Sequence, residues 1–168
     1  MKRSHTTEKT QYLCLCAVIA ALYVALTLIS YALGLANFAI QIRISEALCI
    51  LVCFTPAAIP GVTLGCLLSN FIMGLPLPDI IFGTLASFIG VLIGALLKKH
   101  AWAVPIPTVL ANTLIIPFVL KYAYGLDGTV IFFMVTVGLG EIISAGLFGT
   151  ALFKALKKSR VFGHRPQK

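Results

Sequence analysis

Residues 44–61 read ISEALCILVCFTPAAIPG, and this stretch decides the fold. It lies within one long apolar segment, residues 44–74, which Pro56 and Pro60 interrupt. Each proline removes a backbone hydrogen-bond donor and restricts the residue before it. We therefore predict two short helices here rather than one long helix.

The composition of the whole chain places these helices in a lipid bilayer. Of 168 residues, 60% are hydrophobic and 11% are charged, and the mean hydropathy is +1.03. Soluble domains are about half apolar and about a quarter charged, so a soluble enzyme and a disordered chain are both excluded. We expect a basic N-terminal tail over residues 1–10, one transmembrane domain over residues 11–157 and a basic C-terminal tail over residues 158–168.

The distribution of positive charge predicts six passes. Other apolar spans cover residues 12–35, 79–97, 101–120 and 128–156. If residues 44–74 cross twice, eleven of the thirteen Lys and Arg residues fall on one side, and Arg43 and Lys121 fall on the other. If they cross once, nine basic residues fall outside. Because basic residues gather on the cytoplasmic side, we predict an all-α integral membrane bundle of six transmembrane helices in the cell membrane, with both termini cytoplasmic.

The second of these helices, near residues 44–54, is too short to cross a bilayer upright, since about 20 residues are needed. Backbone that is not hydrogen-bonded cannot face lipid. We expect this helix to tilt, to kink or to be shielded by protein, which makes the bundle compact and irregular.

Glu141 is the strongest single indication of a functional site. It lies about 12 residues into the last span, roughly 18 Å from its outer end and so near the bilayer midplane. A charge there is costly and marks a functional site by default; the structural alternative is a protonated glutamate bonded to another helix. Asn112 lies about 15 Å into the preceding span, where it serves either a ligand or an interhelical amide bond.

Three more charged residues are predicted near the outer face. Arg43 and Glu46 stand three residues apart at the start of the second helix, and Asp79 opens the fourth helix. A structural explanation exists for each of them. Arg43 and Glu46 can form a local ion pair, and Asp79 is an acid at a helix N-terminus, where it interacts favourably with the helix dipole. The functional alternative is a polar path that leads from the outer face toward the middle of the membrane.

Several chemistries are excluded by what the sequence lacks. It has no Gly-Lys-Ser/Thr loop for ATP, and its three histidines lie in or beside basic segments, away from any serine nucleophile. The five cysteines lie in apolar runs without a histidine, so we expect no metal site. The basic clusters flank membrane spans and form no aromatic-interleaved face for nucleic acid. We expect a protein that binds a small molecule, holds no cofactor and hydrolyses no ATP itself.

Small residues recur at helical spacing in three places. They are the stripe Ala17, Ala21 and Ala25 on the first helix, the pair Gly61 and Gly65, and the pair Gly90 and Gly94. Small residues at this spacing let another helix approach closely. That helix belongs either to the same bundle or to a partner protein.

Four sequence runs together resemble one transporter family. They are QIRISEAL at residues 41–48, FTPAAIPG at 54–61, DIIFGTLA at 79–86 and GLGE at 138–141. With six predicted passes and the alanine stripe, they resemble the QueT queuosine-precursor group among the substrate-binding S components of energy-coupling-factor (ECF) transporters, which are ABC-type importers. The similar segments span residues 17–156.

The resemblance implies a bacterial membrane protein that binds a 7-deazaguanine, either a queuosine precursor or queuine, from the outer side. It also implies three partner subunits, one transmembrane coupling subunit and two cytoplasmic ATPases that hydrolyse the ATP. The S component would deliver its ligand by reorienting in the membrane. The stripe Ala17, Ala21 and Ala25 would contact the coupling subunit.

The chemistry of such a ligand fits several of the residues above. A guanine-like edge offers two parallel N–H donors, which the carboxylate of Glu141 can accept together. Asn112 can donate and accept at once, and Phe82 can stack on the base. The charged residues of the outer face can gate the pocket; they are Arg43, Glu46 and Asp79.

Other interpretations stay open at this point. An S component for a different vitamin-like substrate would use the same pocket. A multi-pass scaffold of the cell-shape machinery would need no midplane Glu141. An integral-membrane enzyme would need an acid–base pair or a metal cluster, and neither is visible in the sequence.

Overall fold

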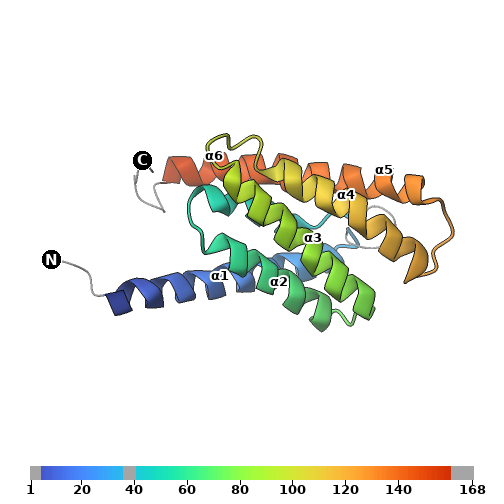
Figure 1. Cartoon of the computed structure of the whole chain (residues 1–168), viewed down its shortest axis with the longest axis horizontal. Helices are drawn as coiled ribbons and strands as arrows, with labels where there is room; N and C mark the ends of the chain where they lie inside the picture. The colour runs from blue at the N-terminus through green and yellow to red at the C-terminus, as the bar shows by residue number, and fades with distance from the viewer. Residues whose placement is uncertain (1–4, 36–40, 160–168) are drawn as a thin grey trace.

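The described part of the chain, residues 5–35 and 41–159 of the computed structural model, is helical apart from its turns. In chain order the elements are α1 (His5–Ala32), the 3₁₀-helix η1 (Ile44–Cys53), α2 (Ala58–Ile72), α3 (Leu77–Leu96), α4 (Pro105–Tyr122), α5 (Val130–Glu141), the π-helix η2 (Ile142–Phe148) and α6 (Gly149–Ser159). They run back and forth along the long axis of the molecule, so that α1 begins at the same end where α6 finishes (Figure 1).

Four helical segments are long and apolar enough to cross a membrane. They cover Thr7–Ala32, Leu77–Leu96, Pro105–Tyr122 and Val130–Ser159. The last of them consists of α5, η2 and α6 in one continuous helix. The shorter apolar helices η1 and α2 supply the two remaining passes through the bundle, so the prediction of an all-α, six-helix membrane protein is confirmed.

The prediction that residues 44–74 form two helices is also confirmed. Residues 54–57 separate η1 from α2, and Pro56 lies in this connection. Pro60, however, does not interrupt the chain as predicted, because it is the third residue of α2. The first turn of a helix tolerates proline, since its N–H groups have no intrahelical acceptor.

α1 begins earlier than the predicted span, at His5 rather than at residue 12. Its first turns are polar, and Glu8 lies in the first turn, where an acid interacts favourably with the helix dipole. The helix therefore extends past its apolar part. The remainder of the predicted N-terminal tail, residues 1–4, and residues 160–168 of the predicted C-terminal tail lie outside the described residues.

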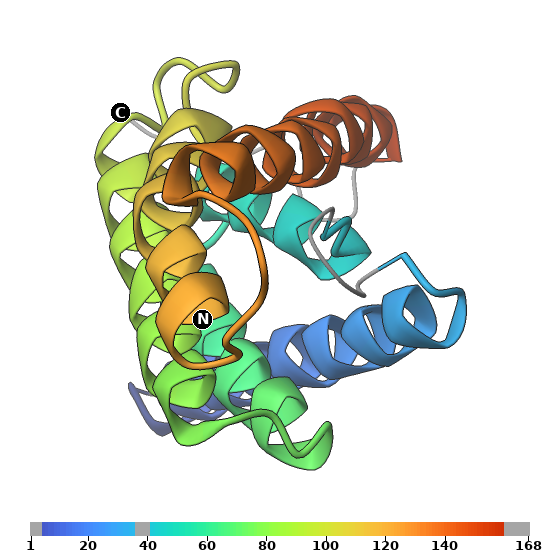
Figure 2. The same ribbon diagram turned by 90° about the vertical axis from the view of Figure 1, so that its right-hand side faces the viewer.

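The short helix η1 lies inside the bundle. It contacts α1, α2, α3, α4, η2 and α6, and Figure 2 shows it between α1 and the last helix. Residues 45–52 are all buried. A 3₁₀-helix rises about 2 Å per residue, so the ten residues of η1 span about 20 Å, against about 15 Å for an α-helix of the same length. The expected shielding by protein is confirmed, and the 3₁₀ geometry lengthens the reach of a short helix.

Glycines let the helices around η1 pack closely. A Cβ on Gly61 would lie 2.8 Å from the Ile19 Cβ of α1, and a Cβ on Gly94 would lie 2.8 Å from the Val104 carbonyl oxygen before α4. Carbon atoms in contact stay about 3.5–4.0 Å apart, so neither position accommodates a larger residue. The glycine pairs predicted from their spacing therefore pack within the bundle, α2 against α1 and α3 against α4.

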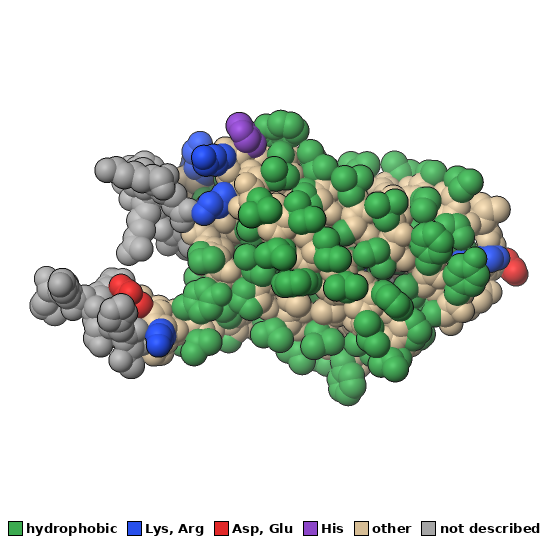
Figure 3. Space-filling model, viewed as in Figure 1, with side chains coloured by type: hydrophobic (Ala, Val, Ile, Leu, Met, Phe, Trp, Pro, Cys, Tyr) green, Lys and Arg blue, Asp and Glu red, His purple; other side chains and the backbone are tan. Residues whose placement is uncertain are grey.

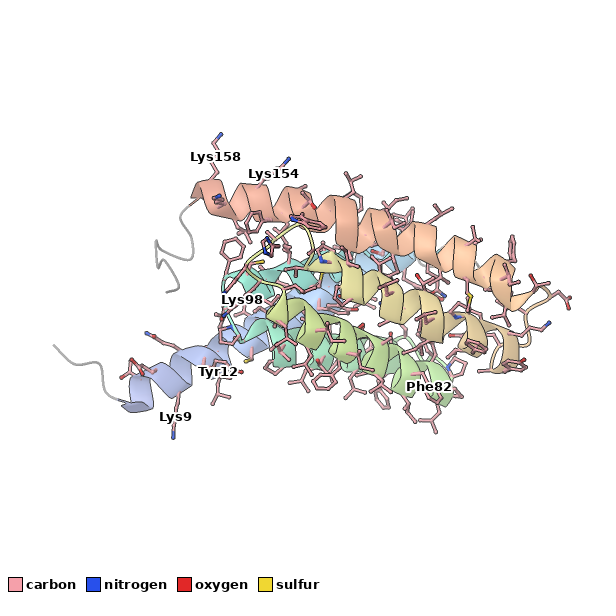
Figure 4. All side chains as sticks on the ribbon, turned by 45° about the horizontal axis from the view of Figure 1, so that its top comes forward. Lys9, Tyr12, Phe82, Lys98, Lys154 and Lys158 are labelled. Carbon is pink, nitrogen blue, oxygen red and sulfur yellow. The ribbon has the colours of Figure 1, made fainter. Side chains whose placement is uncertain are left out.

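Charged side chains gather at the two ends of the molecule, and hydrophobic side chains cover the middle of the face in Figure 3. Lys9 of α1, Lys98 after α3, and Lys154 and Lys158 of α6 all lie at one end (Figure 4). The six-pass prediction placed these three basic segments on the same side of the membrane, and in the structure their lysines lie at the same end of the molecule. The positive-inside rule assigns this end to the cytoplasm, and that orientation stays a prediction.

Gly90→Ala is expected to lower the stability of the protein, because the new Cβ would lie 2.5 Å from the Thr108 Cα of α4. Overpacking of this kind costs about 1–3 kcal/mol. Thermal unfolding of the purified protein in detergent measures the effect. Gly146→Ala is the control, since its Cβ would meet nothing closer than 3.9 Å; equal melting temperatures for the two variants would contradict the close packing of α3 on α4.

Candidate functional site

Among the residues that the structure describes, four charged side chains are buried inside the bundle, and each is one that the sequence singled out. They are Arg43, Glu46, Asp79 and Glu141, and the most exposed of them, Arg43, shows only 7% of its surface. They come from the start of η1, the first turn of α3 and the junction of α5 with η2. Buried charges are costly in a membrane protein and mark functional sites, so this interior is the candidate site.

Glu46 is held by two hydroxyl groups from neighbouring helices. Tyr23 of α1 donates its hydroxyl to Oε1 of Glu46, and Ser87 of α3 donates to the same oxygen at 3.2 Å. The other oxygen, Oε2, is buried and has no hydrogen-bond partner among the described residues. The two donors fix the orientation of the carboxylate and leave one oxygen available.

Arg43 bonds to α2. Its Nη1 donates to Oδ1 of Asn70 at 3.3 Å, and the Asn70 amide in turn donates to the Cys66 sulfur at 3.7 Å. The Nε of Arg43 is buried without a partner among the described residues. The guanidinium therefore joins η1 to α2 through Asn70, which a local ion pair with Glu46 would not do.

Asp79 ties the outer turn of α3 to the chain after α4. Its Oδ2 accepts a 2.6 Å hydrogen bond from the hydroxyl of Tyr124. Burial, and then this hydrogen bond, raise the pKa of Tyr124 above its usual value, so the phenol stays protonated and donates. The Oδ1 of Asp79 has no partner among the described residues and lies beside Asn70 and Gly83.

Glu141 lies where the last helix changes its winding. It ends α5, and the π-helix η2 follows directly. π-Helical turns within α-helices occur frequently at functional sites. No described residue donates a hydrogen bond to Glu141, and its Oε2 is fully buried. The helix η2, which begins directly after Glu141, packs against η1, which carries Glu46.

Asn112 is buried on α4, with 4% of its surface exposed. Its amide donates to the Thr108 carbonyl oxygen of its own helix at 3.1 Å. The structure thus shows an intrahelical bond, where the sequence left open an amide bond between helices. The hydroxyl groups of Thr108 and Thr113 on the same helix are buried and unpaired among the described residues.

The unpaired polar atoms are the most informative feature of this interior. Arg43 Nε, Glu46 Oε2, Asp79 Oδ1 and Glu141 Oε2 are all buried without a hydrogen-bond partner among the described residues. Buried polar side chains are almost always hydrogen-bonded, and an exception calls for a specific explanation. A polar ligand that enters the bundle would provide the missing partners.

Phe82 lies apart from this group. Its side chain is 46% exposed and points away from the bundle near the end opposite Lys98 (Figure 4). It lines an apolar groove of about 580 Å³ between α3 and α4, together with Phe118 and Tyr122. The structure therefore does not bring Phe82 together with the buried charges.

The structure adds residues that the sequence analysis did not single out. Tyr23, Asn70, Ser87 and Tyr124 supply hydrogen bonds to the buried charged groups. Asn70 could have been singled out from the sequence, because it is an amide inside an apolar span, as Asn112 is. Tyrosine and serine are common in membrane helices, so the other three carried no such signal.

The alanine stripe faces outward. Ala17, Ala21 and Ala25 are exposed, whereas Ala20 and Tyr23 on the opposite face of α1 are buried against the bundle. The glycine pairs are occupied within the bundle, but the alanine stripe is not. The stripe therefore does not pack against the described part of the bundle.

The fold and the interior define the class of this protein: a multi-pass, all-helical membrane protein whose helices enclose buried charged side chains. Residues 13–158 match the family described as "QueT transporter", which is most of the chain. The chain therefore belongs to the QueT transporter family, and the predicted resemblance is confirmed.

A curated relative agrees with this family. The chain is 37% identical over 87 residues to the protein named queuosine precursor transporter QueT from Lactococcus lactis subsp. cremoris (strain MG1363). The alignment covers 52% of this chain and 48% of that relative, so the chain matches about half of the relative's length. No solved structure matches the chain significantly.

Tyr23→Phe is expected to destabilise the protein, because Glu46 would lose one of its two donors in a buried setting. Ser87 still donates to the same oxygen, so the cost is that of one lost hydrogen bond to a charged group, about 1.5–3 kcal/mol. The melting temperature in detergent reports the change. The control is Tyr31→Phe, which removes a hydroxyl from a tyrosine of the same helix that is 47% exposed. If Tyr23→Phe and Tyr31→Phe have the same melting temperature, the hydrogen bond from Tyr23 to Glu46 does not contribute to the stability of the folded protein.

Proposed function

We propose that this protein is the substrate-binding S component of an ECF-type importer and takes up a 7-deazaguanine, either a queuosine precursor or queuine. The observation that carries the proposal is the pair of buried carboxylates Glu46 and Glu141, each with an oxygen unpaired among the described residues. A compact ring system rich in N–H donors would complete these bonds. The family is one of transporters, and the name of the L. lactis relative supports a queuosine precursor as substrate.

Glu141 is the residue proposed to bind the guanine edge. That edge presents two parallel N–H donors, and a carboxylate can accept both when neither of its oxygens is engaged. Among the described residues no hydrogen-bond donor to Glu141 is present, and its Oε2 is buried without a partner there. Asn112 is proposed to contact the ring oxygen or a ring nitrogen. Phe82 is left out of the proposed pocket, because its side chain points outward.

The coupling subunit is proposed to bind along Ala17, Ala21 and Ala25. Small residues on an exposed helix face let a second helix approach closely within a membrane. The sequence contains no ATP-binding loop, so energy would come from two separate ATPases attached to the coupling subunit. Arg43, Glu46 and Asp79 are proposed to lie on the path by which the ligand enters from the outer side.

Glu141→Gln is expected to weaken the binding of 7-deazaguanines at least about tenfold, since an amide cannot accept from both donors of a guanine edge. Calorimetry on the purified protein in detergent would compare queuine, its aminomethyl and cyano precursors, guanine, riboflavin and thiamine. Glu8→Gln is the matched control, because it makes the same change in an exposed acid at the far end of the bundle.

Each possible result of this binding comparison supports a different function for the protein. Binding of deazaguanines alone by the unaltered protein supports the proposal, and unchanged affinity in Glu141→Gln removes that residue from the site. Binding of a vitamin instead would keep the S-component role and change its substrate. No binding by the folded protein would favour a membrane scaffold.

Ala21→Trp is expected to abolish co-purification of the coupling subunit and ATPases while leaving ligand affinity within about twofold, because a large side chain would hold the partner helix away. Affinity purification from the native membrane, followed by identification of the bound subunits, measures this. Leu114→Trp on α4 is the control, since Leu114 is also exposed. Retained ATPases in Ala21→Trp would argue against the stripe as the contact surface.

A further inference from the structure

A groove lies on the outside of the bundle, between α4 and the last helix, at the end where the lysines gather. It has a volume of about 250 Å³; α4 and the loop before it form one wall, and η2 and α6 form the other. Its lining includes Trp102, Ile106, Leu110, Ile142, Gly146 and Thr150. Apart from the Thr150 hydroxyl and the Trp102 indole N–H, the side chains of this lining are apolar. The groove is therefore suited to a hydrocarbon chain.

A glycine leaves one wall of the groove hollow. η2 packs against α4, and Gly146 lies within η2. A Cβ on Gly146 would meet nothing closer than Ile142 Cγ2 of the same helix, at 3.9 Å. On the other side of α4, by contrast, a Cβ on Gly90 would lie 2.5 Å from the Thr108 Cα. The space beside Gly146 is thus not filled by the packing of the bundle.

Two lysines continue the wall that the last helix forms. Ile142, Gly146 and Thr150 recur every four residues in the groove, and Lys154 and Lys158 extend the same spacing along α6. Residues four apart on a helix are neighbours on one face, and Figure 4 shows both lysines projecting from the same face of α6. Because side chains in a helix lean toward its N-terminus, Lys154 leans toward the end of the groove at Thr150.

No acidic residue compensates these lysines. The sequence has no acid after Glu141 and none between Asp79 and Asp127, so α4, α6 and the loop before α4 all lack one. Lys154 and Lys158 are exposed, whereas the amine of the neighbouring Lys157 lies 6.0 Å from the centre of the Phe153 ring. Two positive charges beside an apolar groove are complementary to an anion that carries a hydrocarbon chain.

Trp102 places the groove at the surface of the membrane. Its side chain is 73% exposed, and tryptophan gathers at the level of the lipid headgroups. It lines the same groove as Thr150, which lies one helical turn before Lys154. The apolar part of the groove therefore lies at the depth of the acyl chains, and the lysines lie at the depth of the headgroups.

From this arrangement we infer that the groove is a binding site for one anionic phospholipid of the leaflet that is predicted to be cytoplasmic. One acyl chain lies in the groove along Gly146, and the headgroup phosphate lies beside Lys154 and Lys158. Anionic lipids give the cytoplasmic leaflet its negative surface potential, and basic pockets between membrane helices on that side bind their headgroups. The site uses neither the buried carboxylates nor α1, so it does not depend on the proposed function.

The test compares two phospholipids with the same acyl chains and different headgroups. Phosphatidylglycerol carries a net negative charge, whereas the choline of phosphatidylcholine cancels the charge of its phosphate. Native mass spectrometry of the full-length protein, released from detergent after titration with each lipid, counts the molecules that stay bound. The first phosphatidylglycerol is expected to bind about tenfold or more tightly than phosphatidylcholine, since each lysine near the phosphate contributes about fivefold.

A double variant, Lys154→Gln with Lys158→Gln, identifies the headgroup contacts. It keeps the length of both side chains and removes their charge. Phosphatidylglycerol is expected to bind this variant within about threefold of phosphatidylcholine, whose own affinity changes little. Lys157→Gln is the matched control, because it removes one charge from the same helix but from a lysine that lies against Phe153, and it should keep the preference.

Gly146→Leu tests the groove itself. The new side chain would fill the hollow wall and is expected to weaken both lipids by about tenfold or more, since the acyl chain loses its place. The control is Leu114→Trp, which changes the apolar groove at the opposite end of α4 and should weaken neither lipid.

Four results would overturn the inference. Equal affinity of the unaltered protein for the two lipids would do so, and this comparison needs no variant to fold. A full preference for phosphatidylglycerol in the double lysine variant would show that the headgroup lies elsewhere, and unweakened binding in folded Gly146→Leu would exclude the groove. Displacement of phosphatidylglycerol by an equal concentration of soluble glycerol 3-phosphate would show a site for free phosphate. The binding of deazaguanines is measured separately, so each result leaves the proposed function as it stands.

Discussion

The enclosure of η1 is the constraint on which the rest of this structure depends. Ten residues cannot cross a hydrocarbon core of about 30 Å as an α-helix, and bare backbone ends cannot face lipid. The bundle meets this constraint by surrounding η1 with five other passes and by winding it as a 3₁₀-helix. The close packing that this requires comes from glycines, where α2 meets α1 and where α3 meets α4.

The same enclosure creates the charged interior. Because η1 is buried, Arg43 at its start and Glu46 in its first turn are held inside the protein rather than at a membrane surface. Tyr23, Ser87 and Asn70 reach them from three of the helices that surround η1. The partners cover only part of the hydrogen-bonding capacity, and the proposed ligand would bond to the unpaired remainder. Under the proposed function, structural shielding and ligand recognition use the same element.

Much of the fold was predictable because the bilayer restricts what a chain can do. Hydropathy located the passes, the prolines located the break before α2, and the three basic clusters grouped the ends correctly. The errors lie at boundaries that hydropathy does not mark: the polar start of α1, and Pro60, which a helix tolerates in its first turn. Glu141 and Asn112 stood out because polar residues inside apolar spans are rare. The structure does not place Phe82 among the buried charges. The sequence could not show this, because sequence spacing does not indicate which face of α3 turns inward.

The sequence by itself determined the membrane class, the six passes and the identity of the charged residues that matter, since each of these follows from the cost of placing polar groups in lipid. The tertiary structure decided the rest. Only packing determines that Tyr23 and Ser87 donate to one oxygen of Glu46, that Asp79 is engaged by Tyr124, and that Glu141 receives no donor from the described residues. These pairings join residues far apart in the chain, and their partners are fixed by helix rotation and depth, which no local pattern in a sequence encodes.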